Sequence, residues 1–244
     1  MSSSPCTQVF ASAEEIADAA AQQFVELANE RQGRFAVALA GGTTPRRTYE
    51  LLAGKKFRDH VEWSKVHLFF GDERCVRQDH PDSNYRMAHE ALISQVDIPH
   101  SNVHPINGHG DPATNAAHYE AELREYFRNS TKPAFDLVLL GLGEDGHTAS
   151  LFPQTEALGV TERWVIENWV EKLQSYRITL TVPAINSGAH VTFLVAGANK
   201  APAVSGVLNG RVQTENLPAQ LIKPEAGTLT WLLDSRAASL LQKD

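Results

Sequence analysis

The sequence predicts an α/β fold: a doubly wound, mostly parallel, Rossmann-like sheet with helices on both faces. Short apolar segments alternate with amphipathic helical segments along most of the chain, as in successive β-α-β units. Several apolar segments are uninterrupted by polar residues, as expected of parallel strands that are covered on both faces. The chain has 244 residues, of which 42% are hydrophobic and 21% charged, an ordinary composition for a globular protein. We expect residues 1–244 to form a single domain.

The first elements begin at Ser12, which forms a capping box with Glu15. Apolar residues then follow at helical spacing: Ile16, Ala20, Phe24 and Leu27. Residues 35–40 (FAVALA) are a buried strand that ends in Gly-Gly-Thr-Thr-Pro. A helix follows through residues 48–53, and we expect Thr44 to be its N-cap and Pro45 its first residue.

The middle of the chain continues the alternation. Residues 66–70 (VHLFF) are the next strand, followed by helices at 83–93 and 111–127, and residues 135–140 (FDLVLL) are strand-like again. Further strands are expected at 164–170, 176–182, 190–197 and 228–234. A helix is expected at 199–208 and a short one after the last strand.

The charge and cysteine content limit the classes of function. The net charge of −7 gives no basic surface for nucleic acid. Two cysteines, Cys6 and Cys75, are too few for a disulfide framework, which favours a reducing compartment. The first residues lack the features of a signal peptide, and no apolar segment has the length of a membrane span. We expect a cytoplasmic enzyme without a membrane association, and no protein partner is evident.

Three polar, glycine-containing loops follow predicted strands: residues 41–45, 71–74 and 141–150. In open α/β sheets, ligands bind outside the carboxyl ends of the strands. These loops are therefore the candidate site.

The loop GLGEDGHTAS contains Gly-x-Gly-x-x-Gly, the spacing of a dinucleotide-binding loop. That function also needs a full helix after the loop and a following strand that ends in an acidic residue. Pro153 lies seven residues after Gly146, so any helix here has only one or two turns, and the next residues are loop-like. The pattern argues against a nicotinamide or flavin cofactor, and none is expected.

The same glycines allow a sharp turn that presents His147. A histidine at a helix N-terminus is kept neutral by the helix dipole, as a general base requires, and Asp145 is close enough to orient it. The alternative is a histidine that only caps the turn.

The loop GGTTP is a candidate anion site. Gly41 and Gly42 allow backbone N–H groups to converge, Thr43 and Thr44 add hydroxyls, and the helix N-terminus favours a negative charge. The Gly-Lys-Ser/Thr ending of a nucleotide-binding P-loop is missing, so a single phosphate fits better. An ordinary strand–helix turn is the alternative.

The loop GDER places Asp72 and Arg74 at a strand end, where the guanidinium can bind a phosphate or an oxyanion. A surface ion pair is the alternative. Lys200, at another strand–helix turn, adds positive charge, and Arg177 lies in an apolar strand where it needs a partner or an edge position. Asn84 begins a helix that can face the site.

A metal site is not expected. His100, His104 and His109 cluster in sequence, but their loop is rich in proline and glycine and has no tight ligand spacing. The chain also lacks His-Glu-x-x-His and paired Cys-x-x-Cys motifs.

Five ordered blocks resemble the 6-phosphogluconolactonase family over nearly the whole chain. They are ALAGGTTPRRTYELLA, VHLFFGDERCVRQDHPDSNYRMA, LVLLGLGEDGHTASLFP, RITLTVPAIN and FLVAGANKA. The resemblance implies a lactonase of the oxidative pentose phosphate pathway that acts on a phosphorylated sugar lactone. It implies His147 as the base that activates water, with Arg74, Asp72 and Asp145 in the catalytic group. The substrate-binding set would be Gly41, Gly42, Thr43, Thr44, Arg46, Asn84, Arg177 and Lys200.

Two rival functions share the scaffold. The related glucosamine-6-phosphate deaminases resemble this chain in the Gly-x-Gly-x-Asp-Gly-His segment, but residues 148–153 (TASLFP) and Asp72-Glu73-Arg74 fit the lactonase blocks better. A sugar-phosphate sensor without activity is the other rival, although His147, Arg74 and Lys200 occur together here.

Overall fold

The computed structural model describes residues 5–128 and 130–241. It contains a seven-stranded sheet in the order β1-β10-β9-β6-β2-β3-β5, in which every pairing is parallel. Its strands are β1 (Cys6–Phe10), β2 (Phe35–Leu39), β3 (Val66–Phe70), β5 (Val103–His104), β6 (Leu137–Leu140), β9 (His190–Val195) and β10 (Thr228–Asp234). The predicted parallel α/β sheet is confirmed.

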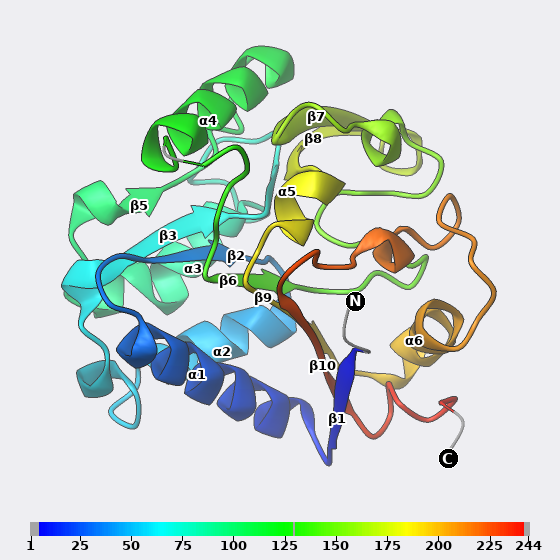
Figure 1. Ribbon diagram of the computed structural model, residues 1–244, viewed down its shortest axis with the longest axis horizontal. Coiled ribbons are helices and arrows are strands. Elements are labelled where there is room, and N and C mark those ends of the chain that lie inside the picture. The colour runs from blue at the N-terminus through cyan, green and yellow to red at the C-terminus, as the bar shows by residue number, and fades with distance from the viewer. Residues whose placement is uncertain (1–4, 129, 242–244) are drawn as a thin grey trace.

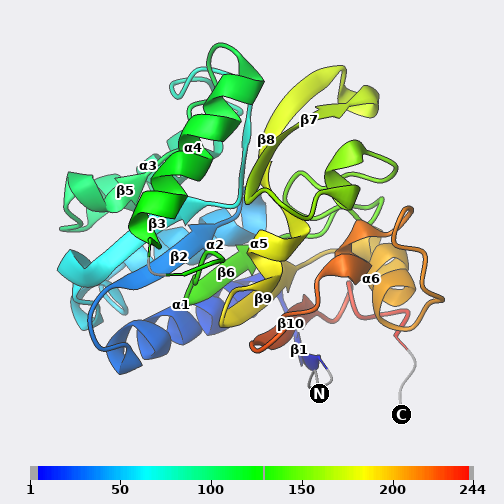
Figure 2. The same ribbon diagram turned by 45° about the horizontal axis from the view of Figure 1, so that its top comes forward.

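Helices cover both faces of this sheet (Figures 1 and 2). On one face lie α1 (Ala13–Glu30), α2 (Thr43–Ala53) and α3 (Asn84–Ala91), and on the other lies α4 (Pro112–Tyr126). Aromatic contacts define the two faces: Phe35 of β2 meets Phe24 of α1 at 5.3 Å, whereas Phe69 of β3 meets Tyr126 of α4 at 4.9 Å. The remaining helices are α5 (Val182–Asn186) and α6 (Ala201–Leu208). This two-layer burial explains why the central strands are continuously apolar.

A second sheet was not expected from the sequence. It is antiparallel, in the order β4 (Asp72–Arg74), β8 (Ser175–Leu180), β7 (Val165–Val170). The segments predicted at 164–170 and 176–182 are therefore strands, but they do not extend the parallel sheet. Since β4 begins two residues after β3, the chain passes directly from one sheet to the other, and the polar GDER segment gains a strand partner in β8.

Other differences are local. β1 was missed because four of its five residues are exposed, and β5 because it has only two residues. The expected terminal helix is absent from the described residues, since residues 235–241 form turns. The first helix begins as expected, with the Ser12 hydroxyl accepting from the Glu15 N–H.

The order of the parallel strands positions the site. β9, β6, β2 and β3 are consecutive neighbours, so the loops that follow them meet at one edge of the sheet. From β2 the chain proceeds outward to β3 and β5, and then returns to β6 on the opposite side of β2. The boundary between β2 and β6 is therefore the topological switch point, where ligands bind in such folds.

His67 and His104 form a pair at the large sheet, and the pKa of His67 lets us predict how the free energy of unfolding depends on pH. His67 Nδ1 lies 3.2 Å from His104 Nε2, and His104 Nδ1 lies 2.6 Å from Glu122 Oε1. Burial lowers the pKa of His67 to about 4, and the charges of His104 and Arg34 act in the same direction. The pKa in the folded state is thus below the unfolded value of 6.5, so the stability that His67 contributes above pH 6.5 is lost as the pH falls toward 4.

We expect His67→Phe to remove this contribution. Urea unfolding at a series of pH values should show a flatter fall of the unfolding free energy between pH 6.5 and 4 in the variant than in the wild type. Equal slopes in the two proteins would show that His67 is not the group involved.

Candidate functional site

The loops after β2, β3, β6 and β9 enclose a cavity of two connected parts. The first part, of about 250 Å³, is lined by residues 40–45 of the α2 N-terminus and by Asn84. The second, of about 440 Å³, is lined by Asp145, Lys172 and Arg177. The two parts share Asp72, Arg74, Gly143, His147, Ala149 and Lys200. Eleven of the twelve residues proposed from sequence thus line one continuous cavity.

The N-terminus of α2 opens into the first part. The helix begins at Thr43 with Gly42 as its N-cap, so the expectation that Thr44 caps the helix and Pro45 begins it is wrong. Gly42 has a φ of 103°, a conformation that glycine adopts without strain. The earlier start places the N–H groups of Thr43 and Thr44 in the first turn, where backbone N–H groups have no partner inside the helix.

Gly41 and Asn84 fit closely together. A Cβ on Gly41 would lie 2.1 Å from Asn84 Oδ1, so only glycine permits this approach. Asn84 Nδ2 donates to the carbonyl oxygen of Asp72 at 2.9 Å and to its Oδ1 at 3.1 Å. Asn84 therefore joins the loop after β2 to the loop after β3.

Asp72 is buried and held by two donors. Besides Asn84, the hydroxyl of the buried Ser150 donates to Asp72 Oδ2 at 2.6 Å. Asn168 Nδ2 donates in turn to the carbonyl oxygen of Ser150 at 2.9 Å. Ser150 was not proposed from sequence, although it lies in the glycine loop. It joins the loop after β6 to Asp72.

Glu73 is a second residue that sequence reasoning missed. Its Oε1 accepts from the N–H groups of Asn84 and Arg74, and its Oε2 accepts from the N–H of Tyr85 and the hydroxyl of Ser83. Burial raises the pKa of Glu73, while these backbone donors oppose that rise. The buried carboxylate fixes the start of α3 against β4. Its position between Asp72 and Arg74 was the available signal, because side chains alternate along a strand.

Arg74 and Arg177 are directly opposite each other across β4 and β8. Like charges in such a cross-strand pair repel. Burial lowers the pKa of Arg177, and the Arg74 charge adds to that effect. Arg74 Nη1 donates to the carbonyl oxygen of Asp82, and Arg177 Nη1 donates to Ser175 Oγ and to the carbonyl oxygen of Tyr176. Within residues 5–128 and 130–241, neither guanidinium forms an ion pair with a carboxylate, and both line the second part of the cavity. This arrangement favours an anion between them.

His147 and Asp145 form a close polar pair in the site. His147 Nδ1 lies 2.5 Å from Asp145 Oδ1, and Asp145 Oδ2 accepts from Lys172 Nζ at 3.1 Å. The hydrogen bond from His147 lowers the pKa of Asp145 most, and Lys172 adds to the effect. The ring of Phe152 stacks on the imidazole at 4.0 Å. The imidazole is thus held both at Nδ1 and across its face, and Nε2 remains for other contacts.

The glycines of this loop allow the chain to turn and leave room for the imidazole of His147. A Cβ on Gly143 would lie 2.0 Å from His147 Nδ1, and Gly146 has a φ of 76°. The expectation that His147 stands at a helix N-terminus is wrong, because residues 141–153 form turns and an isolated bridge rather than a helix. Asp145 and Phe152, rather than a helix dipole, define the surroundings of this ring.

Lys200 and Arg46 differ in position. Lys200 lies in the turn after β9 and borders both parts of the cavity. Asn199 Nδ2 donates to Glu144 Oε1 at 2.7 Å, which ties this turn to the loop after β6. Arg46, by contrast, pairs with Glu50 on the exposed side of α2 and is not among the residues that line the cavity.

Neither a metal cluster nor a membrane helix is found in the part of the chain that the structure describes. Residues 5–128 and 130–241 hold no group of three or more His, Cys, Asp or Glu side chains arranged to bind a metal ion. Within the same ranges, every helix is too short or too polar to cross a bilayer.

Comparisons with known proteins identify the family of the chain. The family described as glucosamine-6-phosphate isomerases/6-phosphogluconolactonase matches residues 11–231. The chain is 45% identical over 220 residues to a 6-phosphogluconolactonase of a Nostoc species, with 89% of each chain covered. A 6-phosphogluconolactonase of a Synechocystis species is 46% identical over 214 residues, with 86% of each chain covered. The solved 6-phosphogluconolactonase of Trypanosoma cruzi superposes with a TM-score of 0.88 at 29% identity, covering 100% of this chain and 99% of that one.

Proposed function

Since the chain belongs to the glucosamine-6-phosphate isomerase/6-phosphogluconolactonase family, we propose that it is a 6-phosphogluconolactonase. It would hydrolyse 6-phospho-D-glucono-1,5-lactone to 6-phosphogluconate in the oxidative pentose phosphate pathway. One observation supports this most strongly: a histidine oriented by a carboxylate shares a cavity with three cationic side chains, Arg74, Arg177 and Lys200. The histidine provides a base that can activate water, and the three cationic side chains provide a site for a phosphorylated substrate.

His147 is the proposed general base. Asp145 accepts the Nδ1 proton, so the neutral imidazole has its lone pair at Nε2. Nε2 takes a proton from a water molecule as that water attacks the lactone carbonyl carbon. Asp145 stabilises the imidazolium that forms, and the short contact fixes the tautomer. The protonated Nε2 then returns its proton to the ring oxygen as the carbon–oxygen bond breaks.

The phosphate is proposed to bind at the α2 N-terminus. The N–H groups of Thr43 and Thr44 and the positive end of the helix dipole favour an anion there. Arg74 and Lys200 border the same part of the cavity, and Arg177 adds its charge from beside Arg74. Gly41 and Asn84 keep the loops at the spacing that this site requires. Binding energy from the phosphate then positions the distant lactone carbonyl at His147.

The oxyanion that forms on the carbonyl oxygen needs donors within the glycine loop. The N–H of Gly143 donates to the carbonyl oxygen of His147 at 2.8 Å, and the N–H of Gly146 donates to that of Gly143 at 3.1 Å. Both are therefore engaged within the loop. We assign the oxyanion to the intervening N–H groups of Glu144 and Asp145.

A substrate comparison tests the proposal. Purified protein is mixed with freshly prepared 6-phosphogluconolactone, and 6-phosphogluconate is followed against spontaneous hydrolysis. A parallel reaction contains glucosamine 6-phosphate and is monitored for ammonia. We expect the lactone to open far faster than in buffer and no ammonia to form. Ammonia release with lactone opening at the buffer rate would instead identify a deaminase, and neither reaction would identify a sensor.

Lys172 allows a test of the pair formed by His147 and Asp145, which we call the dyad, through the pH dependence of the reaction. Its ammonium group donates to Asp145 Oδ2 at 3.1 Å, on the side of the carboxylate that His147 does not contact. Lys172→Met removes a positive charge near the dyad, so protonation of the dyad becomes easier. We expect the acid limb of kcat/KM to move to higher pH by less than about one unit, because the side chain is 71% exposed and its charge is screened. Lys172→Arg should preserve the wild-type profile, and an unchanged profile in Lys172→Met would exclude this role.

The cellular setting and domain organisation are proposed from separate observations. Cys6 and Cys75 are both free thiols, which agrees with the reducing cytoplasm that we propose. We propose that residues 1–244 form one domain, since the main buried cluster contains Val165 and Ile178 of the small sheet together with Phe193 of the large one.

A further inference from the structure

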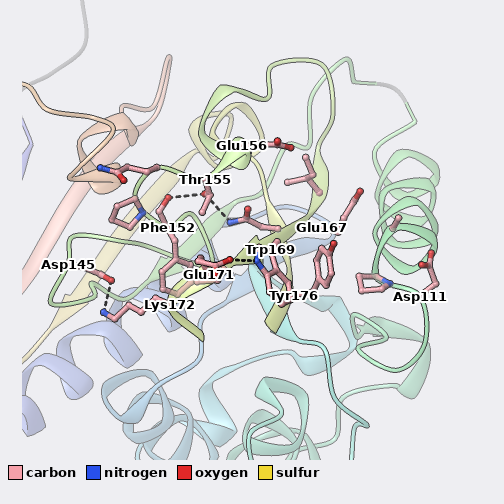
Figure 3. Close-up of a pocket in the computed structure, with 17 residues that line it drawn as sticks. Asp111, Asp145, Phe152, Thr155, Glu156, Glu167, Trp169, Glu171, Lys172 and Tyr176 are labelled. Carbon is pink, nitrogen blue, oxygen red and sulfur yellow. Dashed lines mark hydrogen bonds and ion pairs between the residues drawn. The ribbon is translucent and has the colours of Figure 1, made fainter. Parts of the chain in front are cut away.

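A large cavity lies beside the proposed active site. It is a groove of about 1200 Å³ between the start of α4, the β7–β8 hairpin and residues 152–156 (Figure 3). It shares Asp145, Phe152 and Lys172 with the active-site cavity and extends away from it along β7. Apart from these three residues, none that lines the groove has a role in the proposed reaction.

The groove runs along the free edge of β7. Residues 166–172 all line it, without a gap. Successive side chains of a strand point to opposite faces of the sheet, so a cavity lined by both sets lies at the strand's edge. Within residues 5–128 and 130–241, β7 pairs with β8 on one side and with no strand on the other.

The backbone groups of Glu167 and Trp169 point toward the groove. The carbonyl oxygen of Trp164 accepts from Thr181 across the β7–β8 pair, whereas the N–H of Val165 donates away from β8, to Glu120 Oε2 at 3.5 Å. In an antiparallel pair this direction alternates from residue to residue. Glu167 and Trp169 follow Val165 at two-residue intervals, so their N–H and C=O groups also point away from β8. They are available to an added strand.

The side chains around this edge favour a cation next to an apolar surface. Five carboxylates line the groove (Asp111, Asp145, Glu156, Glu167 and Glu171), together with one ammonium group, that of Lys172, which contacts Asp145. Glu167 also pairs with Arg163 at 3.3 Å, so the groove keeps an excess of negative charge. Trp169 and Tyr176 meet edge to face at 5.0 Å and are 41% and 42% exposed. Their rings, labelled at the centre of Figure 3, lie between Glu167 and Glu171. Lys and Arg pack their apolar stems and cationic ends on such aromatic faces.

We propose that this groove binds an extended segment of a partner protein, with Lys or Arg at alternate positions, which adds to β7 as a fourth strand. Backbone pairing with Glu167 and Trp169 would supply affinity, and the carboxylates would select the basic side chains. A second copy of this chain is a poor occupant, because antiparallel pairing of two β7 edges brings Glu167 carboxylates together. Because Lys172 borders both cavities and contacts Asp145, a bound segment would lie next to the catalytic dyad.

The test uses a synthetic peptide, acetyl-Lys-Val-Arg-Val-Lys-Val-amide, with the full-length protein. Binding is measured by calorimetry and by the amide shifts of Glu167 and Trp169 in 15N–1H spectra. The matched control is the same peptide methylated at every backbone nitrogen, which keeps the charge but cannot pair with a strand. We expect the control to bind at least about tenfold more weakly, since several backbone hydrogen bonds are lost. Equal binding of the two peptides would overturn the proposal, because only charge attraction would then remain.

Variants test the location. Glu167→Pro removes the outward N–H without removing a β7–β8 hydrogen bond and should weaken peptide binding about tenfold. Glu167→Gln separates the effect of charge, and Glu90→Gln, an exposed residue paired with Arg86 on α3, should leave binding unchanged. Should Glu167→Pro fail to fold, the methylated peptide still decides the question. Amide shifts confined to another surface, or a dimer that forms through β7 in the absence of peptide, would overturn the proposal.

Discussion

Replacing His147 with alanine is expected to lower kcat by roughly 10²–10⁴ for 6-phosphogluconolactone, the range that a positioned general base contributes. The reason is geometric: Nδ1 is committed to Asp145 and the ring is stacked on Phe152, so only Nε2 remains to accept a proton from water. The measurement is the initial rate of lactone opening after subtraction of the spontaneous rate.

The control for this experiment is a histidine outside the site. His60→Ala, in a short exposed helix, should keep the wild-type kcat. Both variants should unfold near the wild-type temperature, because His147 is partly exposed and contributes little to the core. Wild-type turnover in a folded His147→Ala protein would remove this residue from the mechanism.

The second large effect that we expect is a loss of kcat/KM when either guanidinium of the Arg74–Arg177 pair is replaced. Each charged hydrogen bond to a phosphate contributes about 1.5–3 kcal/mol, so Arg74→Ala or Arg177→Ala should lower kcat/KM by roughly 10–100-fold. The two side chains repel each other in the free protein. An anion that binds between or beside them reduces this repulsion.

A binding measurement separates this role from a structural one. Inorganic phosphate should raise the unfolding temperature of the wild type by mass action and have little effect on Arg74→Ala. As a matched control, Arg86→Ala removes an exposed arginine that pairs with Glu90, and its response to phosphate should equal that of the wild type. If phosphate stabilises Arg74→Ala as much as the wild type, Arg74 does not belong to the phosphate site.

Sequence patterns were sufficient for the parallel sheet and for the loops around the site. Strands such as β2 and β6 are buried along their whole length, so their residues are uniformly apolar and easily recognised. Short glycine loops after such strands can only lie at their carboxyl ends. That is why Gly41, Asp72 and His147 could be placed together before their contacts were known.

The second sheet was not predictable in the same way. Asp72–Arg74 is entirely polar, and it forms a strand only because Leu180 N and the β8 backbone lie next to the chain as it leaves β3. The opposition of Arg74 and Arg177 depends on this pairing, which is a tertiary contact that spacing along the chain does not reveal. The roles of Glu73 and Ser150 were missed for the same reason, since both act through partners on other segments.

The setting of His147 was also misjudged from local sequence. Gly-x-Gly-x-x-Gly suggested a loop that leads into a helix, but the segment turns back on itself, with the Gly143 N–H donating to the His147 carbonyl oxygen. Leu217, from a distant part of the chain, lies 2.6 Å from where a Gly146 Cβ would be. Packing of this kind fixes a loop but leaves no periodic pattern in sequence.

The most direct measurement compares two lactones, 6-phosphogluconolactone and plain gluconolactone, with the wild type and with Lys200→Ala. The central claim is that the α2 N-terminus and Lys200 bind the phosphate in the same cavity in which His147 activates water at the lactone carbonyl. The wild type should then show a kcat/KM at least ~10²-fold higher for the phosphorylated lactone, since two or three charged hydrogen bonds depend on the phosphate. Lys200→Ala should lose part of this advantage and change little with plain gluconolactone. Equal kcat/KM for the two lactones in the wild type would contradict the claim.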